Sequence, residues 1–254
     1  MPGIFVTQDY IMKKLILTAI VLCSYLFTNA QTTPTTTTDW RKEALERPGD
    51  HFMVSFTSDH WSGTPDSIRH RESGFSRGLG VAIMIDKPFK SDPHWSVAFG
   101  LGVNGSNMFF EKTSIDIKSI STVLPFKNLD SSDHFKKYKL VNVYAEIPIE
   151  LRYSFNPEKH NGGWKMALGL KVGTLLDAHT KGKTLLNSHG ATINAYTLKE
   201  KKKAFFNSTR FAATARLGYG NFTLIGTYSL TNLLKDGTGP DIKPWQIGLC
   251  ISGL

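Results

Sequence analysis

The sequence predicts an all-β protein, an eight-stranded antiparallel up-and-down transmembrane β-barrel. Three observations predict this fold. Apolar and polar residues alternate with a period of two in eight stretches, and that period is typical of strands and not of helices. The connections between these stretches alternate between short and long, and aromatic residues gather at the strand ends beside the short ones. An even strand number, short turns on one rim and long loops on the other are typical of bacterial outer-membrane barrels.

Residues 1–30 have the composition of a secretory signal. Met12-Lys13-Lys14 forms a basic n-region, Leu15 to Phe27 an apolar core, and Ala30 ends a small-residue cleavage site. We expect cleavage after Ala30, with residues 1–11 as an upstream extension from a misassigned start codon. The apolar core has thirteen residues, whereas a helix that crosses a bilayer needs about twenty.

The mature chain keeps one cysteine. A lipid anchor at Cys23 is disfavoured because Leu22, which precedes it, is not a small residue. Cys23 leaves with the signal, so Cys250 has no partner for an intramolecular disulfide. Removal of two lysines and Asp9 lowers the formal charge from +9 to +8 (9 − 2 + 1). In an exported chain, this positive balance points to anionic lipid phosphates and not to nucleic acid.

Residues 31–50 predict a linker and a short N-terminal arm. Residues 31–38 are rich in threonine and too polar to pack a core. Asp39 is placed to cap a short helix over residues 40–47, before Pro48-Gly49. We expect the barrel itself to span residues 51–254.

The eight strands are expected within that span. They cover residues 52–59, 75–85, 94–104, 138–155, 164–173, 210–219, 222–231 and 245–254. The clearest is Tyr138 to Phe155, where the odd positions from Val141 to Tyr153 are apolar and the even ones include the charged residues Glu146, Glu150 and Arg152. We expect the apolar face of each strand to contact lipid and the polar face to line the interior.

The connections and the aromatic residues give the strands an orientation. Short connections fall near residues 86–93, 156–163 and 220–221, and we expect them to be periplasmic; long polar ones fall near 61–77, 111–137 and 177–204, and that at 235–243 is intermediate. Beside the short connections lie Phe52, Trp95, Tyr153, Phe155, Trp164, Tyr219 and Phe222. Aromatic side chains favour membrane interfaces, so these residues predict one interfacial girdle.

One strand carries a family resemblance. The run Ile147 to Tyr153, IPIELRY, follows Tyr144-Ala145-Glu146 and resembles a strand of the PorT-like outer-membrane β-barrel proteins. The resemblance covers residues 52–254, and the signal peptide and strand number fit it. It implies an outer-membrane barrel without an assigned activity. The chain departs from many barrel proteins at its end, Ser252-Gly253-Leu254, where they carry an aromatic residue recognised during assembly.

The interior face is expected to hold a network of charged side chains. Its members are Glu146, Glu150, Arg152, Lys165, Lys171, Arg210 and Arg216. They occupy three neighbouring strands, so acids and bases can pair across the ladder. The interior of an eight-stranded barrel is just wide enough for side chains to fill it, and unpaired buried charges are costly. The sequence therefore predicts a polar plug and not a channel.

Metal, cofactor and nucleic-acid sites are not expected. Five histidines lie in or beside the long connections: His60, His70, His134, His179 and His189. Their spacing differs from that of metal ligands. The run Lys199 to Lys203 is expected to be a solvated stretch that could also contact lipid-linked phosphates. Neither a phosphate-binding glycine-rich loop nor a nucleic-acid-binding module occurs in the sequence.

Two sets of residues could be read as catalytic. Asp59-His60 with Ser62, or Ser188-His189, would suit an outer-membrane lipid-modifying enzyme. Nucleophilic catalysis requires contact between such groups, and the sequence lacks a G-x-S-x-G elbow. We therefore expect no enzymatic activity.

The expected function is that of a non-enzymatic outer-membrane barrel with a structural or interaction role in the cell envelope. Its partners would be outer-membrane lipid and, through the long loops, envelope proteins. The main alternative is a secreted lipocalin-like carrier, whose apolar face would line a ligand cavity. That carrier would leave the aromatics at one rim unexplained, and the G-x-W motif near its first strand is absent.

Overall fold

The computed structural model describes residues 50–73, 76–158 and 162–252. The expected signal peptide, linker and short helix fall outside these residues, as do the last two residues. The described residues all belong to one compact unit. No helix in the described ranges is both long and apolar enough to span a membrane.

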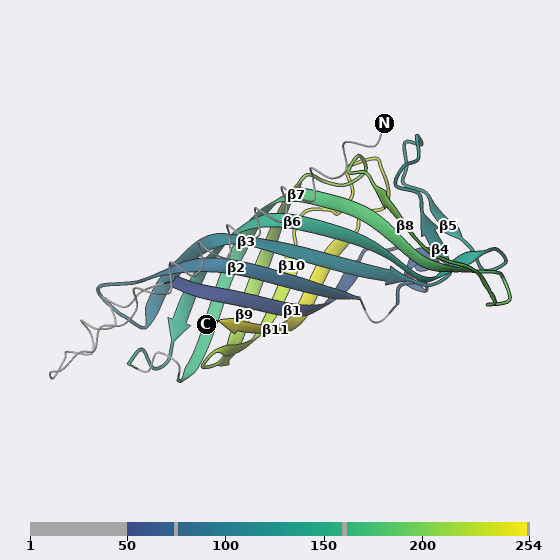
Figure 1. The fold of residues 1–254 in the computed structure, drawn as a ribbon. Coiled ribbons are helices and arrows are strands. Elements are labelled where there is room, and N and C mark those ends of the chain that lie inside the picture. Colours follow the sequence, from purple (N-terminus) through teal and green to yellow (C-terminus); the bar gives the residue numbers. More distant parts are fainter. Residues whose placement is uncertain (1–49, 74–75, 159–161, 253–254) are drawn as a thin grey trace, which may run out of the picture. The chain divides into compact units, whose positions relative to one another are not determined.

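Eight strands of the described chain form a ring (Figure 1). They are β1 (Asp50–Ser62), β2 (Arg77–Pro88), β3 (Trp95–Phe110), β6 (His134–Ser154), β7 (Trp164–Leu186), β9 (Thr209–Tyr219), β10 (Phe222–Ser229) and β11 (Lys243–Ser252). Each pairs antiparallel with the strands before and after it in this order, β1 pairs with β11, and β6 pairs with β7. The predicted eight-stranded up-and-down topology is confirmed.

The two faces of the wall have the predicted polarity. On the outside, Leu101, Leu168 and Phe222 each expose about two thirds of their surface, at 69%, 66% and 66%. On the inside, polar residues such as Glu150 and Gln246 are buried. An apolar exterior with a polar interior is the arrangement of a wall in lipid. The lipocalin-like alternative requires an apolar interior and a polar exterior, so it is wrong.

Aromatic side chains meet at the rim of the short connections. Trp95 packs on Tyr153 with 4.9 Å between ring centroids, and Trp164 packs on Tyr219 at 6.1 Å. Phe222 is the register partner of Tyr219. The turn between these last two strands is tight, and Gly220 adopts a positive φ of 59° that side chains disfavour. The sorting of aromatics predicted from the sequence is therefore present in the fold.

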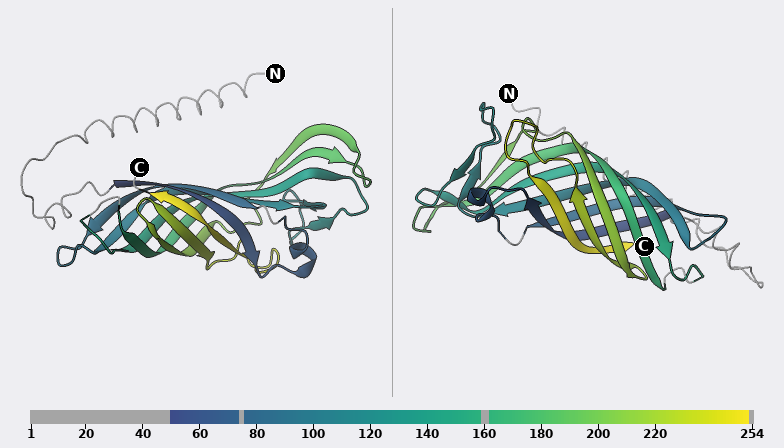
Figure 2. Two further views of the ribbon diagram at one scale, coloured as in Figure 1. Left: turned by 90° about the horizontal axis from the view of Figure 1, so that it is seen from below. Right: turned by 180° about the vertical axis from the view of Figure 1, so that it is seen from behind.

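Two strands continue well past the ring. β6 has 21 residues and β7 has 23, and the far end of β7 pairs with β8 (Thr192–Lys201) instead of β9 (Figures 1 and 2). The expected long loop at 177–204 is therefore wrong, because most of it is a β-hairpin. Leu176 is an extra residue of β7 opposite Val143/Tyr144, and with the positive φ of Thr184 it interrupts the alternation that would have revealed the hairpin.

The long connections pack together into a cap. Its buried apolar side chains from the connections and strand ends are Trp61, Ile68, Met108, Phe110, Ile115, Ile117, Leu124, Tyr138, Leu140, Tyr144, Leu175, Ala178, Phe205, Phe206, Leu233, Leu234 and Ile242. The helix α3 (Asp66–Arg69) supplies Ile68. A two-stranded sheet of β4 (Thr113–Ile115) and β5 (Phe126–Asn128) supplies Ile115. The prediction of long polar connections misses this core, because each connection contributes a few apolar residues that only the fold brings together.

Backbone hydrogen bonds join the members of the cap. The Glu111 N–H donates to the Arg71 carbonyl over 2.9 Å, and the Leu124 N–H donates to the Thr238 carbonyl over 2.8 Å. The Lys235 N–H donates to Phe205 over 2.9 Å. Because these bonds link different connections, the cap is one folded layer and not a set of separate loops.

Candidate functional site

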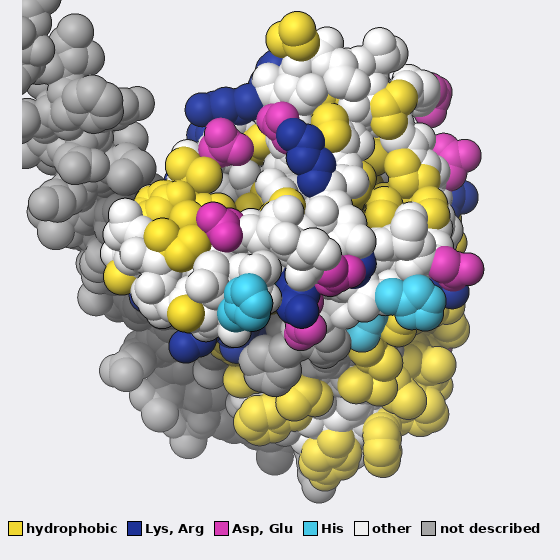
Figure 3. Space-filling model, turned by 90° about the vertical axis from the view of Figure 1, so that its right-hand side faces the viewer, with side chains coloured by type: hydrophobic (Ala, Val, Ile, Leu, Met, Phe, Trp, Pro, Cys, Tyr) yellow, Lys and Arg dark blue, Asp and Glu magenta, His cyan; other side chains and the backbone are white. Residues whose placement is uncertain are grey.

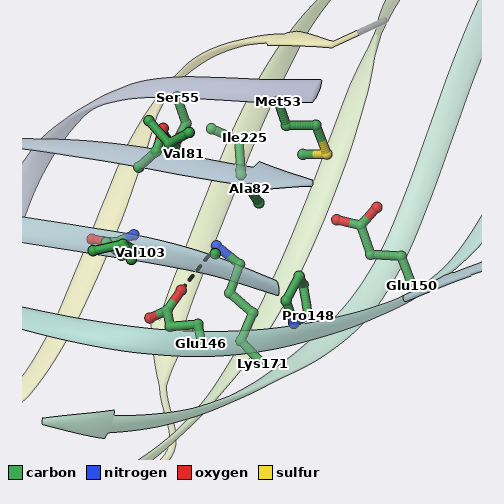
Figure 4. A pocket seen from close by; sticks show the side chains of 13 residues that line it. Met53, Ser55, Val81, Ala82, Val103, Glu146, Pro148, Glu150, Lys171 and Ile225 are labelled. Atoms are coloured by element: carbon green, nitrogen blue, oxygen red, sulfur yellow. Dashed lines mark hydrogen bonds and ion pairs between the residues drawn. The ribbon is translucent and has the colours of Figure 1, made fainter. Parts of the chain in front are cut away.

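The inward face of the ring brings most of the predicted charged residues together. In one row, Glu146 pairs in register with Gly173 of β7, and Gly173 pairs with Arg210 of β9. Arg210 Nη1 lies 3.1 Å from Glu146 Oε1. Lys171 Nζ lies 3.6 Å from Glu146 Oε2, as Figure 4 shows. A buried carboxylate is thus held by two bases from two different strands.

A second cluster surrounds Glu150, which is 2% exposed. Arg216 Nε lies 3.2 Å from Glu150 Oε1, and Arg152 Nε lies 3.0 Å from Oε2. Arg152 also approaches Asp86 of β2, with 3.6 Å between Nη1 and Oδ2. Charges therefore alternate in sign along a chain from β2 through β6 to β9, which compensates for burial of each group.

Two positions differ from the sequence-based set. Lys165 lies at the rim of the short connections, opposite Ser154, and so outside the rows that hold the two glutamates. Asp86 joins the network although the sequence predicts it in the short connection near residues 86–93. Asp86 directly follows the apolar, outward-facing Ile85. The alternation of the strand could therefore have assigned Asp86 to the inward face.

Glycines of β7 leave room for the acids. A Cβ atom at Gly169 would lie 2.8 Å from Glu150 Cγ, and one at Gly173 would lie 3.2 Å from Glu146 Cγ. Gly80 and Gly102 of the second and third strands border a cavity of about 30 Å³ together with these acids (Figure 4). That volume suits about one water molecule.

A third buried carboxylate, Asp59, is held by neutral groups. It accepts hydrogen bonds from Thr57 Oγ1 over 2.7 Å and from Gln246 Nε2 over 2.9 Å, and Ser106 donates a further bond. The sequence suggested Asp59 as a candidate catalytic acid at the end of the first strand. Donors on three strands instead bind it within the barrel.

The first candidate catalytic set does not converge. Asp59 points inward, whereas His60 points outward, stacks on Trp245 at 4.4 Å and lies 2.9 Å from Ser58 Oγ. Ser62 Oγ donates to the Lys243 carbonyl. Strand alternation places neighbouring residues on opposite faces, so Asp59 cannot orient His60.

The second candidate set lies at the tip of the β7–β8 hairpin. Ser188 Oγ is 3.2 Å from His189 Nδ1, and both side chains are exposed. An orienting acid is not among the hydrogen-bond partners that the described chain gives to His189. Groups of three or more potential metal ligands are likewise absent from the described ranges.

Comparison with known proteins gives one family match and two solved structures. Residues 29–235 match the family described as "Outer membrane protein beta-barrel domain". The crystal structure of Ail, the attachment invasion locus protein of Yersinia pestis, is 14% identical, with a TM-score of 0.33, and the match covers 82% of this chain and 100% of Ail.

A second crystal structure of Ail, in complex with the heparin analogue sucrose octasulfate, is 13% identical. Its TM-score is 0.32, and the match covers 80% of this chain and 97% of Ail. The sequence matches no protein among the curated ones.

Proposed function

We propose, from the premise that this chain belongs to the outer membrane protein beta-barrel domain family, that it is a non-enzymatic barrel with a side-chain-plugged lumen. It serves a structural or interaction role in the cell envelope. Family membership and the apolar exterior place the barrel in the outer membrane. The proposal concerns what it does there.

The observation that carries the plug is the pairing of both lumen glutamates with bases. Glu146 is held by Arg210 and Lys171, and Glu150 is held by Arg216 and Arg152. Conduction requires a continuous water path, and these side chains cross the interior of a narrow barrel. The cavity of about 30 Å³ beside them has room for about one water molecule.

The cap supports closure from the other end of the barrel. Its core residues include Phe206 and Ile242, both fully buried, which come from connections far apart in sequence. Buried apolar side chains of this kind disfavour the passage of ions.

The interaction role rests on the outer surface of the cap and the hairpin. Figure 3 shows that end of the molecule, where hydrophobic, charged and histidine side chains alternate. Ile120 is fully exposed at 102%, and Val123 and Ile193 are each about half exposed, at 50% and 51%. Exposed apolar side chains rimmed by polar ones suit contacts with envelope proteins.

Two finer assignments belong to the same proposal. The strand Ile147 to Tyr153 supports membership of the PorT-like subgroup within the wider family. Export would proceed through the signal peptide, which predicts a mature protein that begins at Gln31. N-terminal sequencing of protein purified from envelopes tests that start.

Planar-bilayer recording tests the plug. We expect the purified wild-type barrel to show no steady large single-channel current. A barrel with heat-modifiable gel mobility that nevertheless conducts steadily would overturn the plug, while leaving its location intact. Copurification from intact envelopes, with Ile120→Ser as a partner-surface variant and Lys90→Ser as its control, tests the interaction role.

A further inference from the structure

We propose that the outward face of the β6–β7–β8 extension binds phosphate groups of glycolipids in the outer leaflet. The face carries two lysine rows, defined as Lys139–Lys181–Lys199 and Lys137–Lys183. The inference deepens the proposed role in the envelope, because it names a partner, and it rests on the placement of the barrel in the membrane.

Strand register places the lysines side by side. Lys139 pairs with Lys181, and Lys181 pairs with Lys199, so the first row crosses three strands. Lys137 pairs with Lys183 in the second row. Neighbouring strands lie about 4.8 Å apart, so the first row spans roughly 10 Å. Such a spacing suits phosphates that are carried close together on one molecule.

The rows lie on the same face as the lipid-contacting wall. Odd positions of β6 face outward, and the apolar ones run from Val141 to Tyr153, which is thirteen residues. A tilted membrane strand needs about nine to eleven. Lys139 lies two residues past Val141, about 7 Å along the strand and therefore about 5 Å above the apolar edge. That is the level of the lipid headgroups.

The positive charge of the rows is largely uncompensated. Lys137, Lys181, Lys183 and Lys199 are exposed, and in the described ranges none of them forms an ion pair with a carboxylate. Like charges directly opposite each other destabilise a sheet. Burial lowers the pKa of Lys139, and the charges of Lys181 and Arg77 lower it further. An anionic ligand would relieve this repulsion.

One acid does lie on this face, at its lower edge. Asp177 Oδ1 is 2.9 Å from Lys201 Nζ, and Oδ2 is 2.9 Å from His179 Nδ1. Burial and the charge of Lys199 lower the pKa of His179 despite that contact. Asp177 thus compensates Lys201 and leaves the two rows positive.

The lysines of the basic run Lys199 to Lys203 lie in two different places in the structure. Lys199 belongs to the outward face, whereas Lys202 and Lys203 bond to backbone carbonyls, with 3.2 Å from Lys202 Nζ to Ser119 O and 3.4 Å from Lys203 Nζ to Leu175 O. Those two lysines are part of the cap. The ligand surface therefore comes from three strands and not from one stretch of sequence.

The experiment uses the full mature chain in phosphatidylcholine nanodiscs. The probes are bisphosphorylated lipid A and its dephosphorylated form, and bound glycolipid per barrel is measured by mass spectrometry. The test variant combines Lys181→Gln, Lys183→Gln and Lys199→Gln, which keeps the bond from Lys139 Nζ to Asn107. Its control combines Lys87→Gln, Lys90→Gln and Lys235→Gln, three exposed lysines away from the rows.

Each lysine near an anionic surface contributes roughly fivefold to affinity. We expect the test variant to lose on the order of 10- to 100-fold in affinity for the bisphosphorylated lipid. The control should retain wild-type binding, and 0.5 M salt should weaken wild-type binding. Both variants should keep heat-modifiable gel mobility and show no channel current. A loss of lipid binding can then be told apart from a failure of the plug.

Three results would overturn the inference. The first is equal binding of the phosphorylated and dephosphorylated lipids by the wild type, and the second is unchanged binding in the test variant. The third is lysine-dependent binding of inorganic phosphate or of a soluble sulfated glycan that is tighter than binding of the bisphosphorylated lipid. That result would assign the lysine rows to a ligand outside the membrane.

Discussion

Glu150 and Arg216 pair across a strand that lies between their own. Arg216 Nε is 3.2 Å from Glu150 Oε1, although β6 and β9 each pair with β7 and not with each other. The inward residues of β7 at this level are Ala167 and Gly169, which are too small to separate the two side chains. The ion pair therefore depends on small residues that carry no charge themselves.

Replacement of Glu150 tests how much this ion pair contributes to the stability of the barrel. Glu150→Ala leaves Arg216 buried without its acid, whereas Arg152 keeps Asp86, and loss of one partner of a buried ion pair costs about 3–5 kcal/mol. We expect a loss of this size in the free energy of unfolding, measured by urea titration in lipid vesicles. Glu111→Ala, at an exposed site, is the control and should change it by about 0.5 kcal/mol or less. Equal effects of both variants would contradict the network.

The glycine of β7 gives a second prediction. In Gly169→Ala the added Cβ meets the Ile149 carbonyl and lies 2.8 Å from Glu150 Cγ. We expect destabilisation of about 1–3 kcal/mol, the usual result of overpacking. The matched control is Gly226→Ala on β10, because a Cβ there has no heavy atom within 4 Å. The prediction fails if the two alanine variants unfold at the same urea concentration.

The wall of the barrel could be predicted from sequence because its physics is local. Between Val143 and Tyr153 each side chain faces lipid or lumen according to its parity, so the alternation alone assigned Glu146 and Glu150 to the interior. The same parity rule assigned Lys171, Arg210 and Arg216 to the interior network. Lys165 did not join the rows because parity gives the face of a residue and not its height in the wall.

The cap could not be predicted in this way. Ile68, Ile117 and Phe206 stand in separate connections without a repeating period, and only long-range contacts reveal that they share a core. The hairpin of β7 and β8 was missed for a related reason. Leu176, the extra residue of β7 opposite Val143/Tyr144, and the positive φ of Thr184 change the parity of β7 midway.

Truncation of the cap core gives a third prediction. Phe206 is fully buried, and Phe206→Ala should cost about 3–5 kcal/mol if the cap unfolds together with the barrel. Ile120→Ala, at a fully exposed site in another connection, should change stability by about 0.5 kcal/mol or less. Urea unfolding measures the loss. If Phe206→Ala increases only protease cleavage of the connections and leaves barrel unfolding unchanged, the cap is a separate folding unit.

A salt bridge between two connections of the cap gives the last prediction. Hydrogen bonds from Arg71, with 3.0 Å from Nη1 to Oδ1, lower the pKa of Asp130 from 3.8 to about 2. A carboxyl group with a lowered pKa stabilises the fold above pH 4, and this contribution disappears as the pH falls toward 2. Carbon-13 NMR in micelles should therefore show titration of Asp130 near pH 2, and Arg71→Gln should raise that midpoint. Arg69→Gln is the control, because Arg69 approaches Asp66 instead. A wild-type midpoint at the ordinary value would show that the two connections are not joined in solution.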